Sequence, residues 1–156
     1  MNLRQRRIKR RRDGSYKLDL PDDERTLLAS LPGQLQEVLE HQPDDPALRR
    51  LFPPAYPVDR DEEDEYRRLM GDDLAAGHLQ ALQVLGATAA ENSLTEEQLM
   101  IWLRAINQLR LVLGTRLDVD EETSGMLPDP EEPDADVRTV FIYLGWLQEQ
   151  VVEALS

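Results

Sequence analysis

The chain has 156 residues, of which 40% are hydrophobic, so it has the size of one domain with a modest core. Its formal net charge of -13 disfavours binding to DNA and to anionic membranes, because phosphates and anionic headgroups repel an acidic protein. It contains no cysteine, which excludes disulfides, cysteine-ligated zinc and thiol nucleophiles within this chain.

The charge is divided unevenly between the N-terminus and the rest of the chain. Residues 1–20 contain eight Lys or Arg and two Asp, a net charge of +6, which leaves -19 for residues 21–156. We therefore divide the chain into a basic N-terminal β-hairpin at 1–20 and an acidic α-helical domain at 21–156. We expect the hairpin to pack on the helices so that the two parts form one domain.

The hairpin is predicted by an Asp-Gly pair at residues 13–14, which lies between a basic run and a segment of alternating apolar residues. Its strands are expected at about residues 5–12 and 15–20. A three-residue loop that begins at the Asp of this pair would place Ile8 opposite Leu20 on the apolar face, which a two-residue turn would not do. We therefore predict the register that pairs these two residues.

The basic side chains of the hairpin are the main candidates for a binding surface. Clustered guanidiniums on a two-stranded ribbon can neutralise phosphates, and such a ribbon can enter the major groove of DNA. They can also pair with an acidic protein partner, with the protein's own acidic body, or with the body of a second copy. The candidate residues for binding a partner or a nucleic acid are Arg6, Arg7, Lys9, Arg10, Arg11 and Arg12.

A first helix is predicted to follow Pro21, because leucines recur at helical spacing between about residues 27 and 39. Pro32 and Gly33 interrupt this pattern. Because a proline inside a helix removes a hydrogen bond and clashes with the preceding turn, we expect a kink or a break into two short helices near Leu31.

Two further helices are predicted in the middle of the chain. A proline-rich loop at 43–57 precedes an acidic run at 59–65, which suits the N-terminus of a long helix that reaches about Leu85. Thr95 and Gln98 can form a capping box, which predicts the start of the next helix. That helix is apolar nearly all round, so it should be the central, buried one.

An acidic loop at about 118–133 separates the central helix from a final helix that begins at about Asp134. The predicted fold is therefore mainly α, a helical bundle of about four to five helices preceded by an N-terminal β-hairpin. A helix-turn-helix reader of DNA is not expected, because the central helix is too apolar to leave the core.

No catalytic, cofactor-binding or metal-binding site is expected. The acidic spacing that begins at Asp118 starts like a calcium loop, but Thr123 stands where that loop needs glycine. His41 and His78 are the only histidines, and neither follows a glutamate by three residues as in di-iron bundles. We therefore predict a protein that is not an enzyme and uses no cofactor. Without a membrane-length apolar run or a secretory signal, we expect a cytoplasmic protein with no membrane partner.

Arg110 is the charged residue of the central helix that we expect to be partly buried. It lies about 120° around the helix from a polar stripe that includes Asn107. We consider two roles for it. One is a structural ion pair or a clamp on backbone carbonyls, and the other is a binding pocket shared with Asn107 and Trp102.

Three segments of the chain resemble a known family: WLRAINQLRLVLGTRL at 102–117, DPALRRLFPPAY at 45–56 and YLGWLQE at 143–149. That family is DUF2017, found in actinobacteria, and the resemblance extends along the whole chain. It implies a transcription-related role, since some members are named oxidative stress regulators. The residues of the first motif that are candidates for a structural or pocket role are Trp102, Asn107, Arg110 and Arg116.

The redox-sensing form of that family role uses cysteines as its switch. Because this sequence has none, thiol sensing does not carry over. Our leading hypothesis is a transcription-related regulatory protein that acts through its basic hairpin on DNA or on a transcription-factor partner. The alternative is a non-enzymatic α-helical module for protein interaction or self-assembly, with a protein partner or a homodimer and no nucleic-acid binding.

Overall fold

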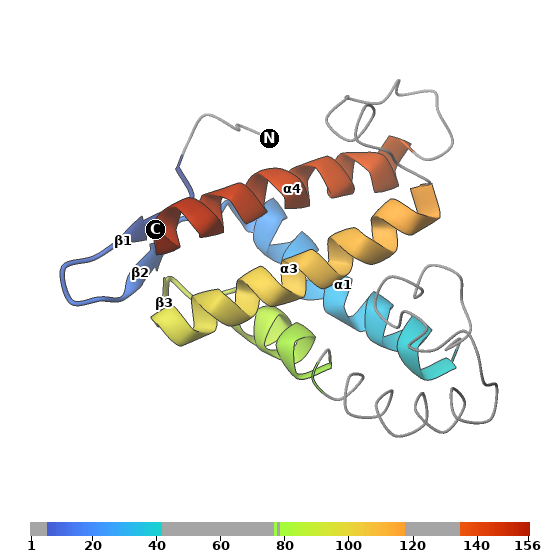
Figure 1. Cartoon of the computed structure of the whole chain (residues 1–156), viewed down its shortest axis with the longest axis horizontal. Coiled ribbons are helices and arrows are strands. Elements are labelled where there is room, and N and C mark those ends of the chain that lie inside the picture. The colour runs from blue at the N-terminus through green and yellow to red at the C-terminus, as the bar shows by residue number, and fades with distance from the viewer. Residues whose placement is uncertain (1–5, 42–76, 78, 118–134) are drawn as a thin grey trace, which may run out of the picture.

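The computed structural model describes residues 6–41, 77, 79–117 and 135–156, and it has the predicted mainly α-helical fold with an N-terminal hairpin (Figure 1). The predicted loops at 43–57 and 118–133, and most of the predicted long helix, lie outside these residues. The strands are β1 (Ile8–Arg10), β2 (Tyr16–Leu18) and β3 (Ser93–Leu94), and the helices are α1 (Asp22–His41), residues 79–88, α3 (Glu96–Leu117) and α4 (Ala135–Leu155).

The hairpin has a register different from the predicted one. Ile8 pairs with Leu18, whereas the sequence pattern pointed to Leu20. The three-residue loop begins one position earlier than expected and ends at Gly14, whose φ of 89° is a left-handed conformation that favours glycine. The Gly14 N–H donates to the Arg11 carbonyl at 3.1 Å, which closes the turn. The pairing therefore shifts by two residues and keeps the same side chains on the buried face.

A third strand, β3, extends the hairpin into a three-stranded antiparallel sheet with the order β1-β2-β3. Tyr16 pairs with Leu94 and Lys17 with Ser93. This short strand was not predicted, because a two-residue strand carries too little periodicity to be recognised. It joins the hairpin to the segment that begins α3.

Helix α1 continues through Pro32, so of the kink or break that we expected near Leu31, the break into two short helices is wrong. Leu28, Leu31 and Leu35 are buried on either side of the proline. Pro32 is itself buried and lies against Gly86, where an added Cβ would be 3.7 Å from the proline Cγ. The burial of this apolar face offsets the hydrogen bond that the proline removes.

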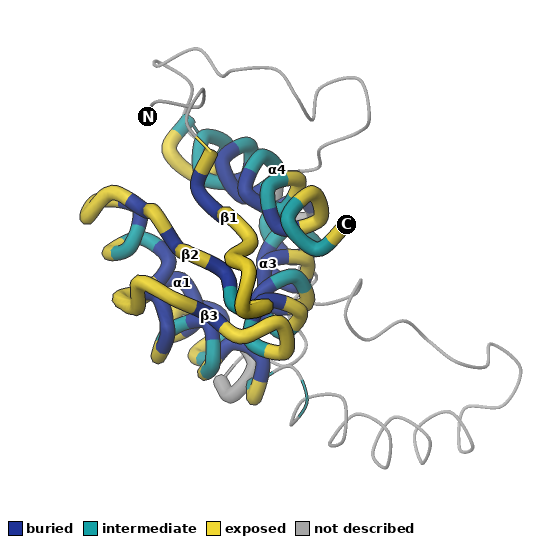
Figure 2. The backbone as a smooth tube through the Cα atoms, turned by 90° about the vertical axis from the view of Figure 1, so that its left-hand side faces the viewer, coloured by how far each residue is buried: buried dark blue, intermediate teal, exposed yellow. Residues whose placement is uncertain are grey.

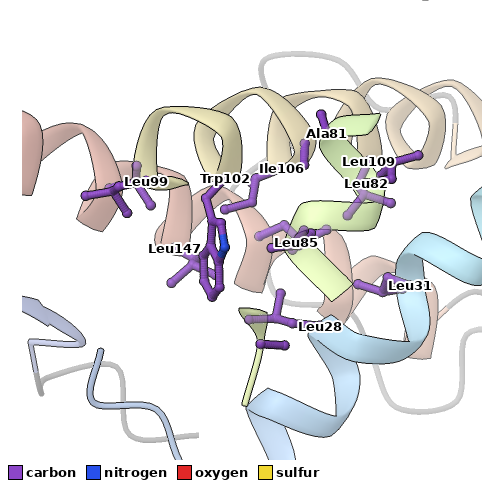
Figure 3. Packing of buried hydrophobic residues seen from close by; sticks show 14 of the residues in the cluster. Leu28, Leu31, Ala81, Leu82, Leu85, Leu99, Trp102, Ile106, Leu109 and Leu147 are labelled. Atoms are coloured by element: carbon purple, nitrogen blue, oxygen red, sulfur yellow. The ribbon is translucent and has the colours of Figure 1, made fainter. Parts of the chain in front are cut away.

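Helix α3 begins with the predicted capping box. The Thr95 N–H donates to Gln98 Oε1 at 2.9 Å, and the Gln98 N–H donates to Thr95 Oγ1 at 3.1 Å. Farther along α3, Trp102 and Ile106 are completely buried, as expected for the central helix (Figure 3). The Trp102 indole N–H donates to the Thr88 hydroxyl at 2.7 Å, so its polar atom is satisfied inside the core.

One hydrophobic core joins the hairpin to the helices. Ile8, Tyr16 and Leu18 from the sheet belong to the same cluster as Leu28 of α1 and Leu147 of α4. Helices α3 and α4 run alongside each other over most of their length (Figure 1). Among the described residues, no helix combines the length and the apolar character needed to cross a bilayer.

Candidate functional site

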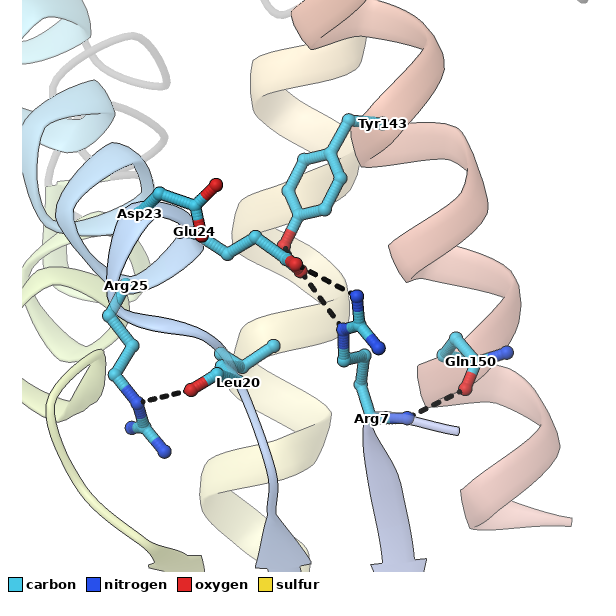
Figure 4. Close-up of polar contacts among 7 residues, drawn as sticks. All are labelled: Arg7, Leu20, Asp23, Glu24, Arg25, Tyr143 and Gln150. Carbon is cyan, nitrogen blue, oxygen red and sulfur yellow. Dashed lines mark hydrogen bonds and ion pairs between the residues drawn. The ribbon is translucent and has the colours of Figure 1, made fainter. Parts of the chain in front are cut away.

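Arg7, one of the predicted binding residues, lies inside the protein. Its side chain is 1% exposed and forms an ion pair with Glu24 of α1, which is 3% exposed. The Nη2 and Nε atoms of Arg7 donate to the two carboxylate oxygens of Glu24 at 2.9 and 3.2 Å (Figure 4). Strand alternation alone places Arg7 on the face of the hairpin opposite Ile8. Both residues are nevertheless buried, because α1 and α4 contact Arg7 at that end of the hairpin.

Helix α4 completes this buried polar cluster. The Tyr143 hydroxyl donates to Glu24 Oε1 at 2.7 Å, and Gln150 Oε1 accepts a hydrogen bond from the Arg7 backbone N–H at 3.2 Å (Figure 4). The Arg7 guanidinium also lies over the Trp146 ring, 5.2 Å from its centroid. Burial, followed by the hydrogen bond to Glu24, raises the pKa of Tyr143. The cluster therefore ties the hairpin to α1 and α4.

Arg25 is a second anchor of the hairpin, and sequence reasoning missed it. Its guanidinium donates to the carbonyls of Leu18 at 3.0 Å, Leu20 at 2.9 Å, Ala89 at 3.0 Å and Glu91 at 2.6 Å. The carbonyl clamp that we considered for Arg110 is thus built by a different arginine. No local pattern marks Arg25, because two of its acceptors lie 64 and 66 residues farther along the chain.

The other basic residues of the hairpin that the structure describes face solvent. Arg6 forms an exposed ion pair with Glu153 at 3.1 Å, a type of contact that contributes little stability. Figure 2 colours the residues of β1 after Ile8 and those of the hairpin turn as exposed. We refer to the five exposed cations of the two strands and the turn together as the cationic face, although strand alternation directs Arg10 to the side of Tyr16 and the pair of Lys9 and Lys17 to the other side; the set consists of Lys9, Arg10, Arg11, Arg12 and Lys17.

The cationic face has no carboxylate partner within the described part of the chain. Lys9 and Lys17 are direct cross-strand partners, so two like charges stand side by side. Such a pair costs stability unless an anion lies near it. Arg11 is the only one of the five with a side-chain hydrogen bond to a described residue, to the Ser93 hydroxyl at 3.1 Å.

The turn that carries these cations is itself ordered by hydrogen bonds. The Ser15 hydroxyl and backbone N–H donate to Asp13 Oδ1 at 2.6 and 2.9 Å. These bonds lower the pKa of Asp13, the hydroxyl bond most strongly. Asp13 therefore stabilises the turn, and the charge of Arg11 beside it also contributes to its lowered pKa.

The four candidates from the first family motif do not form one pocket. Trp102 is buried in the core, and Asn107 is exposed. The side chain of Arg116 lies outside the described residues. Arg110 is half-buried against α4, where its Nη1 donates to Gln148 Oε1 at 2.7 Å. Arg110 is therefore held against Gln148 of α4, whereas Trp102 lies in the core and Asn107 faces solvent.

Arg110 lines a groove of about 560 Å³ on the outer surface of α4. Ile142, Trp146 and Val152 supply apolar surface to this groove, and Glu149 lies at its rim. No group of three or more His, Asp or Glu able to hold a metal ion occurs in the described ranges. Among the described residues, the surfaces best suited to a function are thus the cationic face and this groove.

The family model described as a domain of unknown function (DUF2017) matches residues 5–155. The chain belongs to the DUF2017 family. Over 131 residues it is 33% identical to the oxidative stress regulator AosR of Mycobacterium tuberculosis and to that of Mycobacterium bovis, covering 73% of this chain. The alignment spans only 60% of each relative. No solved structure matches the chain.

The structure brings two of the DUF2017 motif segments together. Residues 102–117 lie in α3 and residues 143–149 in α4, and these helices make the largest helix-to-helix contact among the described elements. Arg110 of the first segment meets Gly145 of the second: a Cβ added to that glycine would be 3.2 Å from the arginine Nη2. In this DUF2017 chain, the two motif segments therefore meet at the interface between α3 and α4 and contribute to the groove beside it.

Proposed function

We propose that this protein is a transcription-related regulator that acts through the cationic face of its hairpin, on DNA or on a transcription-factor partner. The relatives named as oxidative stress regulators support a regulatory role. The observation that carries the proposal is the set of five exposed hairpin cations without a carboxylate partner among the described residues. Among the described residues of the hairpin, only Arg6 and Arg7 form ion pairs with described acidic residues of the protein.

The way in which the hairpin is held supports a recognition role. Arg7 and Arg25 fix its base through buried or partly buried hydrogen bonds, so the cationic face is presented by a supported ribbon. A preorganised surface loses less conformational entropy on binding than a mobile one. The like charges of Lys9 and Lys17 would be relieved by an anionic group placed between them.

The DNA version is tested by the salt dependence of binding. If the five cations each neutralise one phosphate, a plot of log affinity against log salt should have a slope of about -4 to -5. Fluorescence anisotropy with labelled duplex DNA between low and physiological salt measures this slope. Replacing Arg10, Arg11 and Arg12 together with alanine should abolish binding, whereas the charge-preserving triple lysine variant should retain most of it.

The partner version is tested by capture from native lysate with the same variants. A transcription factor that the wild-type chain retains and the triple alanine variant loses would support it. Duplex binding that is absent at low salt, or unaffected by salt, contradicts the DNA version. The proposal as a whole fails if the triple alanine variant also captures the same proteins as the wild type.

A self-assembly module is the second candidate, and the opposite charges of the hairpin and the body favour it. In that case the cationic face of one copy would pair with the acidic body of another. Light scattering at low salt should then detect a dimer that dissociates at high salt and in the triple alanine variant. A monomer at every salt concentration contradicts this candidate.

A further inference from the structure

The guanidinium of Arg110 is unusual because it is half-buried and forms no ion pair with any described residue. Its Nη1 donates to Gln148, and its Cζ lies 4.9 Å from the centroid of the Phe141 ring. Its Nε is buried and has no hydrogen-bond partner in the described part of the chain. A charge that has lost part of its hydration without gaining a counter-charge is costly, which favours binding of an anion.

The surrounding residues hold this guanidinium in place. A Cβ added to Gly145 would lie 3.2 Å from Nη2 and 3.3 Å from Cζ and Nε, so the absence of a side chain there lets the planar group lie against α4. The Phe141 ring and the Gln148 amide restrict it further. Arg110 is thus preorganised at the groove, as a residue that binds a carboxylate needs to be.

Apolar surface lies next to the cation. Trp146 and Ile142 line the same groove, and Val152, which is 49% exposed, extends the apolar surface along α4. A ligand that suits this groove therefore combines one anionic group with an apolar group beside it. A volume of about 560 Å³ accommodates a few side chains of a peptide.

The acidic residues at the rim of the groove indicate whether a nucleic acid or a peptide suits it better. Glu149 lines the groove and has no ion-pair partner among the described residues, while Glu153 is paired with Arg6. A polyanion such as nucleic acid would bring several negative charges towards Glu149, whereas a single carboxylate at Arg110 brings only one, so the repulsion that it meets is smaller. The charge pattern of the groove therefore favours a peptide over a nucleic acid.

We propose that this groove binds a short segment of a protein partner, in which one Asp or Glu carboxylate pairs with Arg110 and a neighbouring apolar side chain covers Trp146 and Val152. This surface is separate from the cationic face, so the inference does not depend on the function proposed for the hairpin. Binding should change the fluorescence of Trp146, because this side chain contacts Arg7 on one side and lines the groove on the other.

The test is a selection from a displayed library of random twelve-residue peptides on the full-length protein. The selected peptides should be enriched in a carboxylate residue next to a large apolar one. Replacing Arg110→Gln should weaken the binding of a selected peptide about tenfold or more, and so should replacing the carboxylate of that peptide with its amide. The two changes together should cost little more than either alone, because they remove the same contact.

Two further variants keep this test decisive. Gly145→Ala retains every charge but displaces the Arg110 guanidinium, so it should also weaken binding, even if the glutamine variant folds poorly. Arg12→Gln removes one cation from the hairpin and should leave the affinity within about twofold. Circular dichroism and thermal unfolding check that each variant is folded.

Three results would overturn the proposal. One is a library that yields no binding peptide. The second is a set of peptides that bind Arg110→Gln and Gly145→Ala as tightly as the wild type, or that lose binding in Arg12→Gln. The third is acetate or phosphate alone displacing the peptide at equal concentration, since the groove would then bind small anions without using the apolar contacts.

Discussion

The Tyr143 hydroxyl donates a 2.7 Å hydrogen bond to Oε1 of Glu24, the same oxygen that accepts from Nε of Arg7. Three donors thus converge on one buried carboxylate. Because they come from the hairpin and from α4, while Glu24 lies in the first turn of α1, the carboxylate fixes three elements at one point. Charge-assisted hydrogen bonds are the strong ones in proteins, so this point should control how the hairpin is held.

Replacing Arg7→Ala should lower the free energy of unfolding by about 3–5 kcal/mol, because Glu24 remains buried without its cation. Urea denaturation at neutral pH measures this change. The double replacement with Glu24→Leu should cost less than the sum of the two single ones. Arg10→Ala, which removes an exposed cation of the same hairpin, is the control and should stay within about 0.5 kcal/mol of the wild type. Additive costs would contradict a coupled pair.

Alkaline stability should depend on Tyr143. Its pKa in the folded protein is raised by burial and by the Glu24 hydrogen bond, above its usual value of 10.0. The resulting stabilisation is fully present below the pKa of the unfolded chain and is lost as the pH rises beyond it. We therefore expect the wild-type free energy of unfolding to fall more steeply above about pH 10 than that of Tyr143→Phe. Parallel pH profiles would contradict this expectation.

Two glycines should respond to alanine with opposite signs. Gly14 has a φ of 89°, so Gly14→Ala should destabilise the protein by about 1–2 kcal/mol. Gly33 lies within α1 with no atom near an added Cβ, so Gly33→Ala should stabilise it by about 0.5–1 kcal/mol. Thermal unfolding of both variants gives the comparison. A similar change in both would mean that the backbone at the turn is not the cause.

Arg25 should be needed for the sheet more than for the helices. Replacing Arg25→Met leaves the carbonyls of Leu18, Leu20 and Ala89 without a donor and should cost roughly 2–4 kcal/mol. Hydrogen exchange should show lost protection first at the amides of β2 and β3. Arg25→Lys should recover only part of the loss, since an ammonium cannot reach several carbonyls as a guanidinium does. Full recovery would contradict the clamp.

Local features of the fold could be predicted from the sequence, and contacts between distant residues could not. The capping box of Thr95 and Gln98 depends on residues three positions apart, and alternation indicates which apolar side chains of the hairpin face the core. The register depends on which residue of the loop adopts a left-handed backbone. We expected the three-residue loop to begin at Asp13, whereas it begins one residue earlier and ends at Gly14. Local periodicity does not contain that information.

The surroundings of the candidate binding residues could be predicted only in part, for the same reason. In the sequence, Arg7 is one arginine of a basic run and looks like its exposed neighbours. Its burial depends on Glu24 and Tyr143, and these two residues are 119 positions apart. The contact between Arg110 and Gly145 likewise requires the packing of α3 on α4. A basic run shows that cations are present, whereas tertiary packing decides which of them reach solvent.

The position of β1 at the edge of the sheet gives its cations a further consequence. An edge strand has backbone groups without a strand partner, and these can pair with the edge of another molecule. Lys9 and Arg10 on β1 oppose such pairing through charge repulsion. Variants that neutralise these two residues are therefore expected to aggregate through this edge. Their aggregation should be measured before a loss of binding is attributed to a missing contact.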